Sequence, residues 1–331
     1  MDIQDKSKII RDNFNKESVN EIQVRPTKLN EFIGQEKIVS NLQVFIGAAK
    51  FRKENLDHVL LHGSPGLGKT TLAQIIAKEI DSDIKITSGP MLSKTRDLAA
   101  VLTNLKKNDV LFIDEIHRMN PNIEEVLYPA MEDFYIDIII GDGPAAKTVK
   151  INIPKFTLIG ATTRLGMLSN PLRDRFGINF KLDFYSNEEL KRVVVRAAKI
   201  FNIKVSDDAA DKISTCSRGT PRISVKLLKR VRDYANYNNS NIINFALVES
   251  SLKKLHIDPI GLDNLDYKYL EFIVYKHNCG PVGIDTISAG IYEDKDTIED
   301  IIEPYLLQLG FVNRTPRGRI VSDICLHHLR K

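Results

Sequence analysis

Two kinds of hydrophobic spacing alternate along the first half of the chain. Short runs of consecutive apolar residues, typical of buried parallel strands, alternate with stretches in which apolar residues recur every three or four positions, as in amphipathic helices. The predicted strands are residues 59–62, 84–87, 110–114, 156–163 and 178–184. The predicted helices are residues 31–53, 69–80, 97–106 and 122–132. This alternation predicts an α/β fold with a mostly parallel sheet.

The alternation is interrupted between residues 134 and 153. Two apolar-rich segments, residues 135–140 and 147–153, flank the turn-forming sequence Gly141-Asp142-Gly143-Pro144. This pattern predicts a β-hairpin inserted into the α/β core. Because an apolar hairpin outside a core invites aggregation, we expect it to contact a partner.

The second half of the chain changes character twice. Ser186-Asn187-Glu188-Glu189 has the form of a capping box, and residues 186–256 contain only helical patterns. Residues 259–331 predict helices near 265–276, 286–291 and 297–308, then short strands at 311–312 and 320–321 around an arginine-rich loop. That order predicts a winged helix, a module that commonly binds nucleic acid and that also serves protein contacts. The predicted organisation is a mobile segment 1–20 followed by domains 21–185, 186–256 and 259–331.

Composition narrows the class of protein. The chain has 331 residues, 43% of them hydrophobic, and no apolar run approaches the ~18 residues of a membrane span. The charged N-terminus shows no signal peptide, so we expect a cytoplasmic protein. Three cysteines in irregular spacing favour reduced thiols. Cys325, His327 and His328 are a weak metal candidate, for which surface or packing roles are favoured.

Charge is distributed unevenly, and its placement tells more than the net value of +4. Residues 186–256 carry 14 basic and 7 acidic side chains. Arg314, Arg317 and Arg319 lie close together in the predicted wing. Such a local cluster favours a contact surface, and a solvated loop is the alternative.

The strongest motif is Gly63-Ser64-Pro65-Gly66-Leu67-Gly68-Lys69-Thr70, which fits the phosphate-loop pattern G-x-x-x-x-G-K-[ST]. It lies between a predicted strand and a predicted helix, as the loop requires. Glycines let the backbone approach phosphates, the helix start offers free N–H groups, Lys69 reaches the β- and γ-phosphates, and the Thr70 hydroxyl can ligate Mg²⁺.

A second motif favours hydrolysis over binding alone. The strand 110–114 ends in Asp114 and is followed by Glu115, at the edge of the sheet where parallel strands deliver side chains to a phosphate site. Asp114 would hold Mg²⁺ and Glu115 would polarise the attacking water. An acidic pair alone would be unremarkable, but the phosphate loop upstream makes it specific.

Three weaker signals support a nucleotide-driven machine. Thr162 and Thr163 follow a buried strand and could sense a γ-phosphate, although turn residues often look the same. The basic segment 173–175 follows the core where oligomeric ATPases place an arginine acting on a neighbour, although two arginines beside an acid more often form a surface ion pair. Arg222 lies in the first turn of a helix after Pro221, a position from which it could reach a bound phosphate and which is also common for a solvated arginine.

Motifs over the whole chain from Arg25 resemble the RuvB family, the AAA+ motors of bacterial Holliday junction branch migration. They are Arg25-Pro26, Phe32-Ile33-Gly34-Gln35-Glu36, the phosphate loop, Ile86-Thr87-Ser88-Gly89-Pro90, Leu111-Phe112-Ile113-Asp114-Glu115-Ile116-His117-Arg118, Tyr128-Pro129-Ala130-Met131-Glu132-Asp133, Ile159-Gly160-Ala161-Thr162-Thr163-Arg164, Pro171-Leu172-Arg173-Asp174-Arg175-Phe176-Gly177, Arg218-Gly219-Thr220-Pro221-Arg222 and Thr315-Pro316-Arg317-Gly318-Arg319. Ser64 departs from the more usual proline without removing a ligand.

The resemblance implies an AAA+ P-loop core with a parallel sheet and inserted β-hairpin, a small all-α lid and a C-terminal winged helix domain. It implies ATP and Mg²⁺ as cofactors. The implied catalytic residues are Lys69, Asp114, Glu115, Thr163 and Arg175, the last reaching a neighbouring subunit. The implied nucleotide-binding residues are Arg25, Gly66, Lys69, Thr70, Thr71, Glu132, Asp133, Phe134, Tyr185 and Arg222, with Thr70 and Asp114 at the metal. Arg314 and Arg319 would bind DNA.

The resemblance also implies partners and an assembly. Family members form hexameric rings on duplex DNA with RuvA, whose contact would be the hairpin 134–153, and with RuvC indirectly in a resolvase complex. Two alternatives remain at this point. One is a clamp-loader or replication-initiator type AAA+ ATPase, and the hairpin and the wing sequence argue against it. The other is a winged-helix regulator that binds ATP without hydrolysis, against which Glu115 argues.

Overall fold

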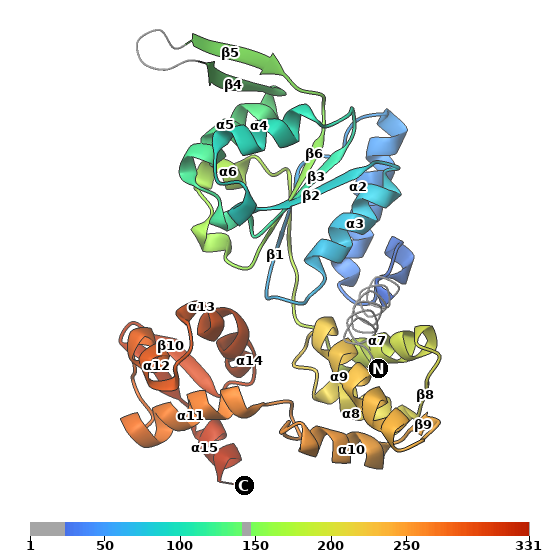
Figure 1. The fold of residues 1–331 in the computed structure, drawn as a ribbon, viewed down its shortest axis with the longest axis vertical. Coiled ribbons are helices and arrows are strands. Elements are labelled where there is room, and N and C mark those ends of the chain that lie inside the picture. Colours follow the sequence, from blue (N-terminus) through green and yellow to red (C-terminus); the bar gives the residue numbers. More distant parts are fainter. Residues whose placement is uncertain (1–23, 141–146, 331) are drawn as a thin grey trace, which may run out of the picture. The chain divides into compact units, whose positions relative to one another are not determined.

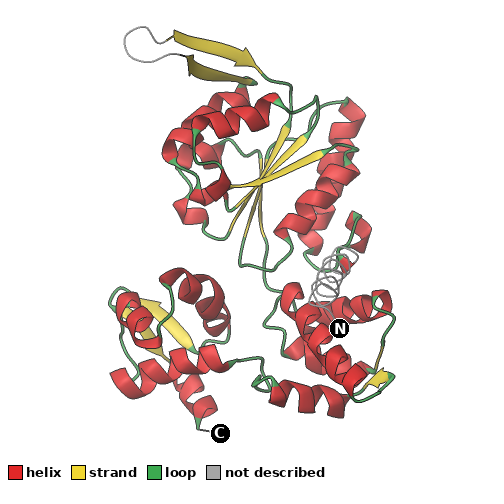
Figure 2. Ribbon diagram, viewed as in Figure 1, coloured by secondary structure: helices red, strands yellow, loops and turns green. Residues whose placement is uncertain are grey.

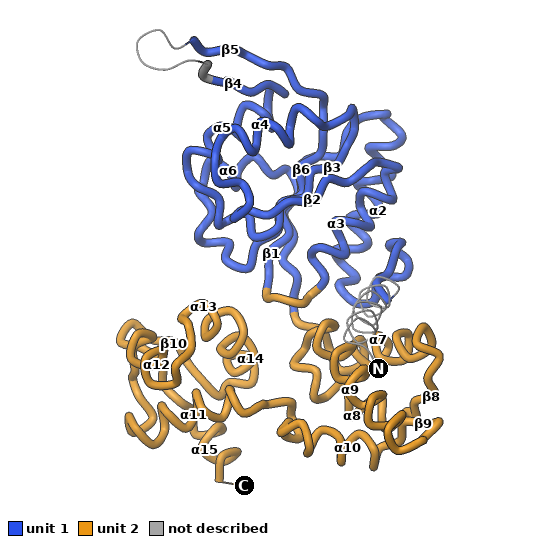
Figure 3. The backbone as a smooth tube through the Cα atoms, in the orientation of Figure 1, with its two compact units in different colours: residues 1–63, 68–183 blue, residues 64–67, 184–331 orange. Residues whose placement is uncertain are grey.

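The computed structural model describes residues 24–140 and 147–330. The predicted mobile segment 1–20 and the predicted turn 141–144 therefore lie outside the described residues. The chain divides into two compact units (Figure 3). The first unit runs to Asp183 without Ser64–Leu67, and the second contains Ser64–Leu67 and the chain from Phe184 onward.

The first unit is built on a five-stranded parallel sheet in the order β2-β3-β6-β1-β7 (Figure 1). Its helices lie on both sides, α2 and α3 on one and α4, α5 and α6 on the other (Figures 1 and 2). The strands are β1 (Val59–His62), β2 (Ile84–Ser88), β3 (Val110–Asp114), β6 (Thr157–Thr162) and β7 (Ile178–Lys181). The helices are α2 (Glu36–Arg52), α3 (Lys69–Glu79), α4 (Thr95–Thr103), α5 (Pro121–Glu132) and α6 (Asn170–Asp174), with 3-10 turns at Leu29–Glu31, Gly89–Met91, Ile116–Arg118 and Leu165–Met167.

Burial explains why the central strands form where the apolar runs predict them. Every residue of β6 is buried, as are the first four residues of β3. A strand covered by helices on both faces has no polar face, so its sequence is continuously apolar rather than alternating. The predicted parallel α/β core is confirmed, and the register places Val59 beside Ile159 and Ile178.

The predicted inserted hairpin is also confirmed. Strands β4 (Tyr135–Ile140) and β5 (Lys147–Asn152) pair antiparallel as a separate two-stranded sheet that extends from the core (Figure 1). Ile136 is fully buried against the core and so anchors the base of the hairpin. Residues 147–150 are exposed along β5.

The second unit begins with the helices α7 (Asn187–Ile200), α8 (Asp207–Thr215), α9 (Pro221–Tyr237) and α10 (Phe245–Lys254). The predicted capping box is present, since Glu189 N–H donates to Ser186 Oγ at 3.3 Å and Ser186 N–H donates to Glu189 Oε2 at 2.8 Å. The expectation of helices alone is wrong in one detail. Strands β8 (Lys204–Val205) and β9 (Ile242–Ile243) form a short parallel pair, and two residues are too few to produce a strand periodicity in the sequence.

The C-terminal part of this unit is a winged helix, as predicted. Its elements are α11 (Asn264–His277), α12 (Ile284–Ile291), α13 (Lys295–Thr297), a π-helical turn (Ile298–Ile302), α14 (Glu303–Gln308), β10 (Val312–Thr315), β11 (Gly318–Val321) and α15 (Asp323–Leu329). The strands are longer than predicted, because the arginine-rich segment pairs Arg314 with Arg319 across the ladder instead of forming an open loop. Among the described residues, no helix is long and apolar enough to cross a membrane.

Candidate functional site

The phosphate-loop motif connects β1 to α3, as its sequence context predicts. Gly63, Gly66 and Gly68 all have positive φ, at +142°, +82° and +104°. A side chain at Gly63 would place its Cβ 2.5 Å from the Leu182 carbonyl oxygen, so only glycine fits there. The glycines of the motif therefore determine the backbone conformation of the loop independently of any ligand.

Lys69 begins α3 and is buried, with 7% of its surface exposed. Its Nζ donates a 2.7 Å hydrogen bond to the Gly63 carbonyl, which holds the ammonium group inside the loop. Thr70 and Thr71 follow on the first turn of α3 and are half-buried. An ammonium group together with the free N–H groups of a helix start forms a site suited to a polyphosphate, so the residues present fit ATP.

Asp114 ends β3 and Glu115 follows it in a left-handed conformation at φ +46°. Asp114 Oδ1 accepts a 3.0 Å hydrogen bond from the Glu115 N–H. Because β1, β3 and β6 are parallel neighbours, both half-buried acids lie at the same edge of the sheet as the start of the phosphate loop.

Gly89 explains a second part of the sequence pattern around these acids. A Cβ at this position would lie 2.4 Å from the backbone oxygen of Glu115. The turn after β2 therefore needs a glycine so that the backbone carrying Glu115 can pass close to it.

Thr163 contacts Glu115 directly, and Thr162 contacts His117, which lies beside Glu115. Thr163 Oγ1 donates to Glu115 Oε2 at 3.3 Å, and the buried Thr162 Oγ1 lies 2.9 Å from His117 Nδ1. His117 Nδ1 is also 3.3 Å from Glu115 Oε2. His117 is a site residue that the sequence reasoning missed, and its place three positions after Asp114 was the signal that could have indicated it.

Within the second unit, Gly66 lies against the start of α9. The Arg222 N–H donates to the Gly66 carbonyl at 3.4 Å, and a Cβ at Gly66 would lie 3.1 Å from the Arg222 Cβ. The buried Tyr185 donates its hydroxyl to the Leu67 carbonyl at 3.1 Å. Three of the predicted nucleotide-binding residues, Gly66, Tyr185 and Arg222, are therefore brought together. Arg25 is exposed.

Arg175 and Glu132 form a separate group at the other end of the sheet. Arg175 Nε lies 3.2 Å from Glu132 Oε1, and its guanidinium lies 4.5 Å from the centre of the Tyr128 ring. Phe134 packs edge-on against Phe156 with 6.2 Å between ring centres.

Strand geometry separates this group from the acids. Phe156 precedes β6 and Thr163 follows it, so at ~3.3 Å per residue the two lie about 23 Å apart along the strand. The structure therefore places Glu132 and Phe134 with Arg175 rather than with Thr162, Thr163 and the two acids of the same chain. Asp133, between them in sequence, is exposed.

The two predicted DNA-binding arginines are joined to one buried acid. Glu303 at the start of α14 has no exposed side-chain surface, and it accepts hydrogen bonds from Arg314 Nε at 2.6 Å and Arg319 Nε at 2.8 Å. Arg319 is largely buried and also donates to Glu299 at 2.9 Å, whereas 45% of the Arg314 side chain is exposed. Arg314 thus offers the more accessible cation.

The weak metal candidate at the C-terminus is occupied by other contacts. His328 Nε2 lies 2.8 Å from Asp258 Oδ2, and Cys325 is fully buried. Burial raises the pKa of the Cys325 thiol to about 12, so the thiol is held protonated. Among the described residues, no group of three or more His, Cys, Asp or Glu side chains is arranged to hold a metal ion.

The fold and the site together define a class: a P-loop ATPase core of the AAA+ type followed by a helical lid and a winged helix. Three family models match in succession, the Holliday junction DNA helicase RuvB P-loop domain over residues 24–182, the RuvB AAA lid domain over 185–258 and the RuvB C-terminal winged helix domain over 259–330. The chain belongs to the RuvB family.

Individual relatives agree with the family models. The Holliday junction branch migration complex subunit RuvB of Orientia tsutsugamushi (strain Ikeda) is 59% identical over 306 residues, 92% of this chain and 94% of that protein. The subunit of the same name from Rickettsia africae (strain ESF-5) is 57% identical over 314 residues, 95% of this chain and 92% of that protein. The solved Thermotoga maritima RuvB Holliday junction branch migration motor is 49% identical with a TM-score of 0.87, covering 93% of this chain and 98% of that one.

Proposed function

We propose that the chain is an ATP-driven motor for branch migration of Holliday junctions in homologous recombination and DNA repair. One observation carries the proposal. The phosphate loop, the acids after β3 and the threonine that reaches Glu115 meet at one edge of the sheet, in a chain of the RuvB family that ends in a winged helix. That combination joins nucleotide hydrolysis to nucleic-acid binding in one polypeptide.

Each residue at this edge has a role that its position supports. Lys69 binds the β- and γ-phosphates, and Thr70 and Asp114 hold Mg²⁺, which supplies charge neutralisation at the phosphates. Glu115 orients the attacking water and accepts its proton, while Thr163 keeps that carboxylate in place. Further nucleotide contacts are assigned to the backbone of Gly66 and to Arg25, Thr71, Tyr185 and Arg222.

Arg175 is assigned to the nucleotide of a neighbouring subunit in a homohexameric ring. Its position beside Glu132, at the end of the sheet opposite the acids, supports a role outside its own site. Glu132, Asp133 and Phe134 would border that same neighbouring nucleotide. Phosphoryl transfer is catalysed mainly by positioning and charge stabilisation, so an arginine from a neighbour contributes a factor of ~10³–10⁵ in rate.

The winged helix is assigned to the phosphate backbone of duplex DNA and Holliday junctions, through Arg314 and Arg319. The hairpin 134–153 is assigned to RuvA, since β5 presents exposed residues away from the five-stranded sheet. RuvC would join indirectly in a resolvase complex. A motor on chromosomal junctions would work in the cytoplasm. The proposed domains are 21–185, 186–256 and 259–331.

An ATPase and branch-migration assay tests the motor. We expect the full chain to hydrolyse ATP faster with RuvA and a four-way junction and to move the junction, and we expect Glu115→Gln to bind ATP without either activity. A clamp-loader or initiator type ATPase, the alternative, would respond to other DNA structures and leave the junction in place. Membership of the RuvB family does not favour it.

Mixed rings test the arginine assignment. In hexamers assembled from equal amounts of wild-type subunits and Lys69→Ala, Arg175→Ala double variants, wild-type sites next to an altered neighbour should lose turnover. Arg173→Ala, an exposed arginine two residues away, is the matched control in the same mixture. If hydrolysis per wild-type site were unchanged with Arg175→Ala, the assignment would be wrong.

A further inference from the structure

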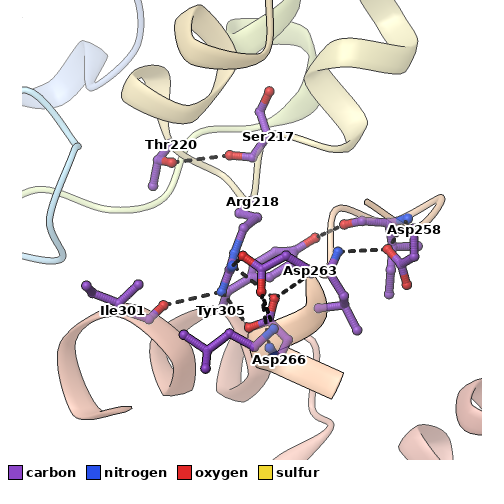
Figure 4. Close-up of polar contacts among 11 residues, drawn as sticks. Ser217, Arg218, Thr220, Asp258, Asp263, Asp266, Ile301 and Tyr305 are labelled. Atoms are coloured by element: carbon purple, nitrogen blue, oxygen red, sulfur yellow. Dashed lines mark hydrogen bonds and ion pairs between the residues drawn. The ribbon is translucent and has the colours of Figure 1, made fainter. Parts of the chain in front are cut away.

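Arg218 lies between α8 and α9, directly before the segment that meets the phosphate loop, and its side chain points to the winged helix (Figure 4). Both terminal nitrogens of its guanidinium donate to Asp266, Nη1 to Oδ2 at 3.0 Å and Nη2 to Oδ1 at 2.9 Å. The Asp266 residue is fully buried and Arg218 is 8% exposed. This is a two-point ion pair between the lid sequence and helix α11.

Further contacts fix the guanidinium on the winged helix. Nη2 donates to the Ile301 carbonyl at 3.3 Å within the π-helical turn, and the group lies 5.1 Å from the centre of the Tyr305 ring. Asp266 also accepts from the Asp263 N–H at 2.9 Å as part of the capping box of α11. One lid side chain therefore contacts both α11 and the helical segment that leads to α14.

The backbone around Arg218 faces the nucleotide loop on its other side. Arg222, four residues on, bonds to the Gly66 carbonyl, and Gly219 accepts a 2.9 Å hydrogen bond from the N–H of Tyr185. Gly66 also lies close to Thr220, since a Cβ there would be 3.8 Å from the Thr220 Cβ. Residues 218–222 thus contact the phosphate loop at one end and the winged helix at the other.

The contribution of the Arg218–Asp266 ion pair to folding stability does not explain why it is present. A buried ion pair contributes little more than well-packed apolar residues of the same volume, because both charges lose their water. Arg218 also has a left-handed backbone at φ +52°, which costs about 1 kcal/mol or more for a residue with a side chain. A two-point ion pair does, however, fix the geometry between the segment before α9 and helix α11.

We propose that Arg218 is a positioning residue that couples the nucleotide at the phosphate loop to the DNA at the winged helix. The inference rests on the proposed function and names the connection within it. A shift of the loop against Thr220 and Arg222 moves the short segment that carries Arg218, and the rigid guanidinium passes that shift to α11. By thermodynamic reciprocity, DNA bound at the winged helix changes nucleotide affinity by the same factor.

The coupling factor is measured with the full chain by two titrations. Affinity for a fluorescent duplex is determined with and without a non-hydrolysable ATP analogue, and affinity for the analogue is determined with and without duplex. The variant Arg218→Met with Asp266→Leu replaces the ion pair by apolar volume. Arg218→Lys keeps the charge and loses the two-point geometry. Arg230→Met with Asp233→Leu makes the same substitutions at an exposed Arg–Asp pair on α9 and is the control.

In the wild type we expect each ligand to change the affinity for the other by about tenfold. In the apolar double variant this factor should fall to near one, while each ligand alone binds within about twofold of its wild-type affinity. Arg218→Lys should lie between the two, and the control should match wild type. An unchanged ratio in the apolar variant would overturn the proposal. If that variant does not fold, as judged by its thermal unfolding, an unchanged ratio in Arg218→Lys overturns it instead.

The wild-type chain separates this inference from the proposed function. Failure of the wild type to hydrolyse ATP or to move a junction would reject the motor itself. A wild type that moves junctions, together with an apolar variant that keeps full coupling, would reject only the role of Arg218. A third readout is the number of ATP molecules hydrolysed per base pair moved, which should rise severalfold in the apolar variant if coupling is lost.

Discussion

The carboxylate of Glu115 lies 3.3 Å from His117 Nδ1, and the same nitrogen lies 2.9 Å from the hydroxyl of Thr162. His117 is 9% exposed, so this contact has little competition from water. The imidazole and Thr163 together restrict where the Glu115 carboxylate can point. The water-polarising acid is thus held by side chains from the turn after β3 and the end of β6.

His117→Leu should therefore lower the turnover number for ATP by about tenfold or more, because a misplaced base loses much of its ~10²–10⁴-fold contribution. Nucleotide affinity should change little, since no phosphate contact is assigned to His117. His117→Asn, whose amide can occupy the position of Nδ1, should recover most of the rate. Steady-state kinetics and titration with a fluorescent nucleotide check both. Equal losses in the Leu and Asn variants would contradict a positioning role.

Gly89→Ala tests the backbone contact beneath the same acid. The added methyl group would lie 2.4 Å from the Glu115 carbonyl oxygen, so the turn carrying Glu115 must shift. We expect hydrolysis to fall by at least about tenfold with nucleotide still bound. Gly166→Ala, where the methyl group meets open space, is the matched control and should keep wild-type rates. Full activity in Gly89→Ala would mean that the turn tolerates displacement.

Glu303 balances the two wing arginines from a fully buried position, and Tyr269 donates to it at 2.9 Å. Glu303→Gln removes the negative charge that faces the largely buried Arg319. Because that guanidinium is shielded from water, we expect the loss to destabilise the wing by about 3 kcal/mol. Hydrogen exchange of the β10 and β11 amides in the full chain measures this. Glu299→Gln, at a half-buried acid that bonds to Arg319, should cost less than about 1 kcal/mol. Similar effects of both variants would contradict a special role for Glu303.

Substitutions of Arg314 and Arg319 should affect DNA binding differently. Arg314→Ala should weaken binding about equally on all duplex sequences and reduce the slope of log affinity against log salt by ~1, as for one phosphate contact. Arg319→Ala should in addition loosen the wing, because Arg319 is largely buried and bonds to Glu299 as well as to Glu303, whereas 45% of the Arg314 side chain is exposed. Salt titrations and amide exchange on both variants distinguish the effects. A strong sequence preference in a selection experiment would reject backbone recognition.

Local rules predicted most of the fold. The strands of the five-stranded sheet follow from short apolar runs, and α7 begins where Ser186 and Glu189 form a capping box. The phosphate loop follows from glycines whose backbone angles only glycine adopts readily. The resemblance to a known family then assigned residues such as Tyr185, whose contact with Leu67 no local pattern indicates.

The contacts that sequence reasoning missed join residues far apart in the chain. Arg218 and Asp266 are 48 positions apart, and each alone resembles an ordinary surface charge. Glu303 looks like an exposed helix residue until the wing folds over it and buries it. Pairing across a fold depends on tertiary packing, which neither periodicity nor a capping signal contains.

His58 gives the fold a dependence on pH. Its Nδ1 accepts a 2.8 Å hydrogen bond from the Leu158 N–H, and its Nε2 bonds to the Met131 carbonyl at 3.0 Å. Burial lowers the pKa of His58 below its ordinary value, although the Met131 carbonyl and Asp57 act in the opposite direction. The neutral ring thus joins β1, β6 and the end of α5.

Since the folded pKa of His58 lies below that of the unfolded chain, the unfolded chain binds the proton more readily. The stabilisation by His58 is fully present above about pH 6.5 and is lost as the pH falls below it toward the folded pKa. His58→Gln can form similar hydrogen bonds but does not titrate. We expect the wild-type melting temperature to drop more than that of His58→Gln between pH 7.5 and 5.5, measured by circular dichroism. Parallel pH profiles of the two proteins would show that the folded state does not favour the neutral form of the His58 ring.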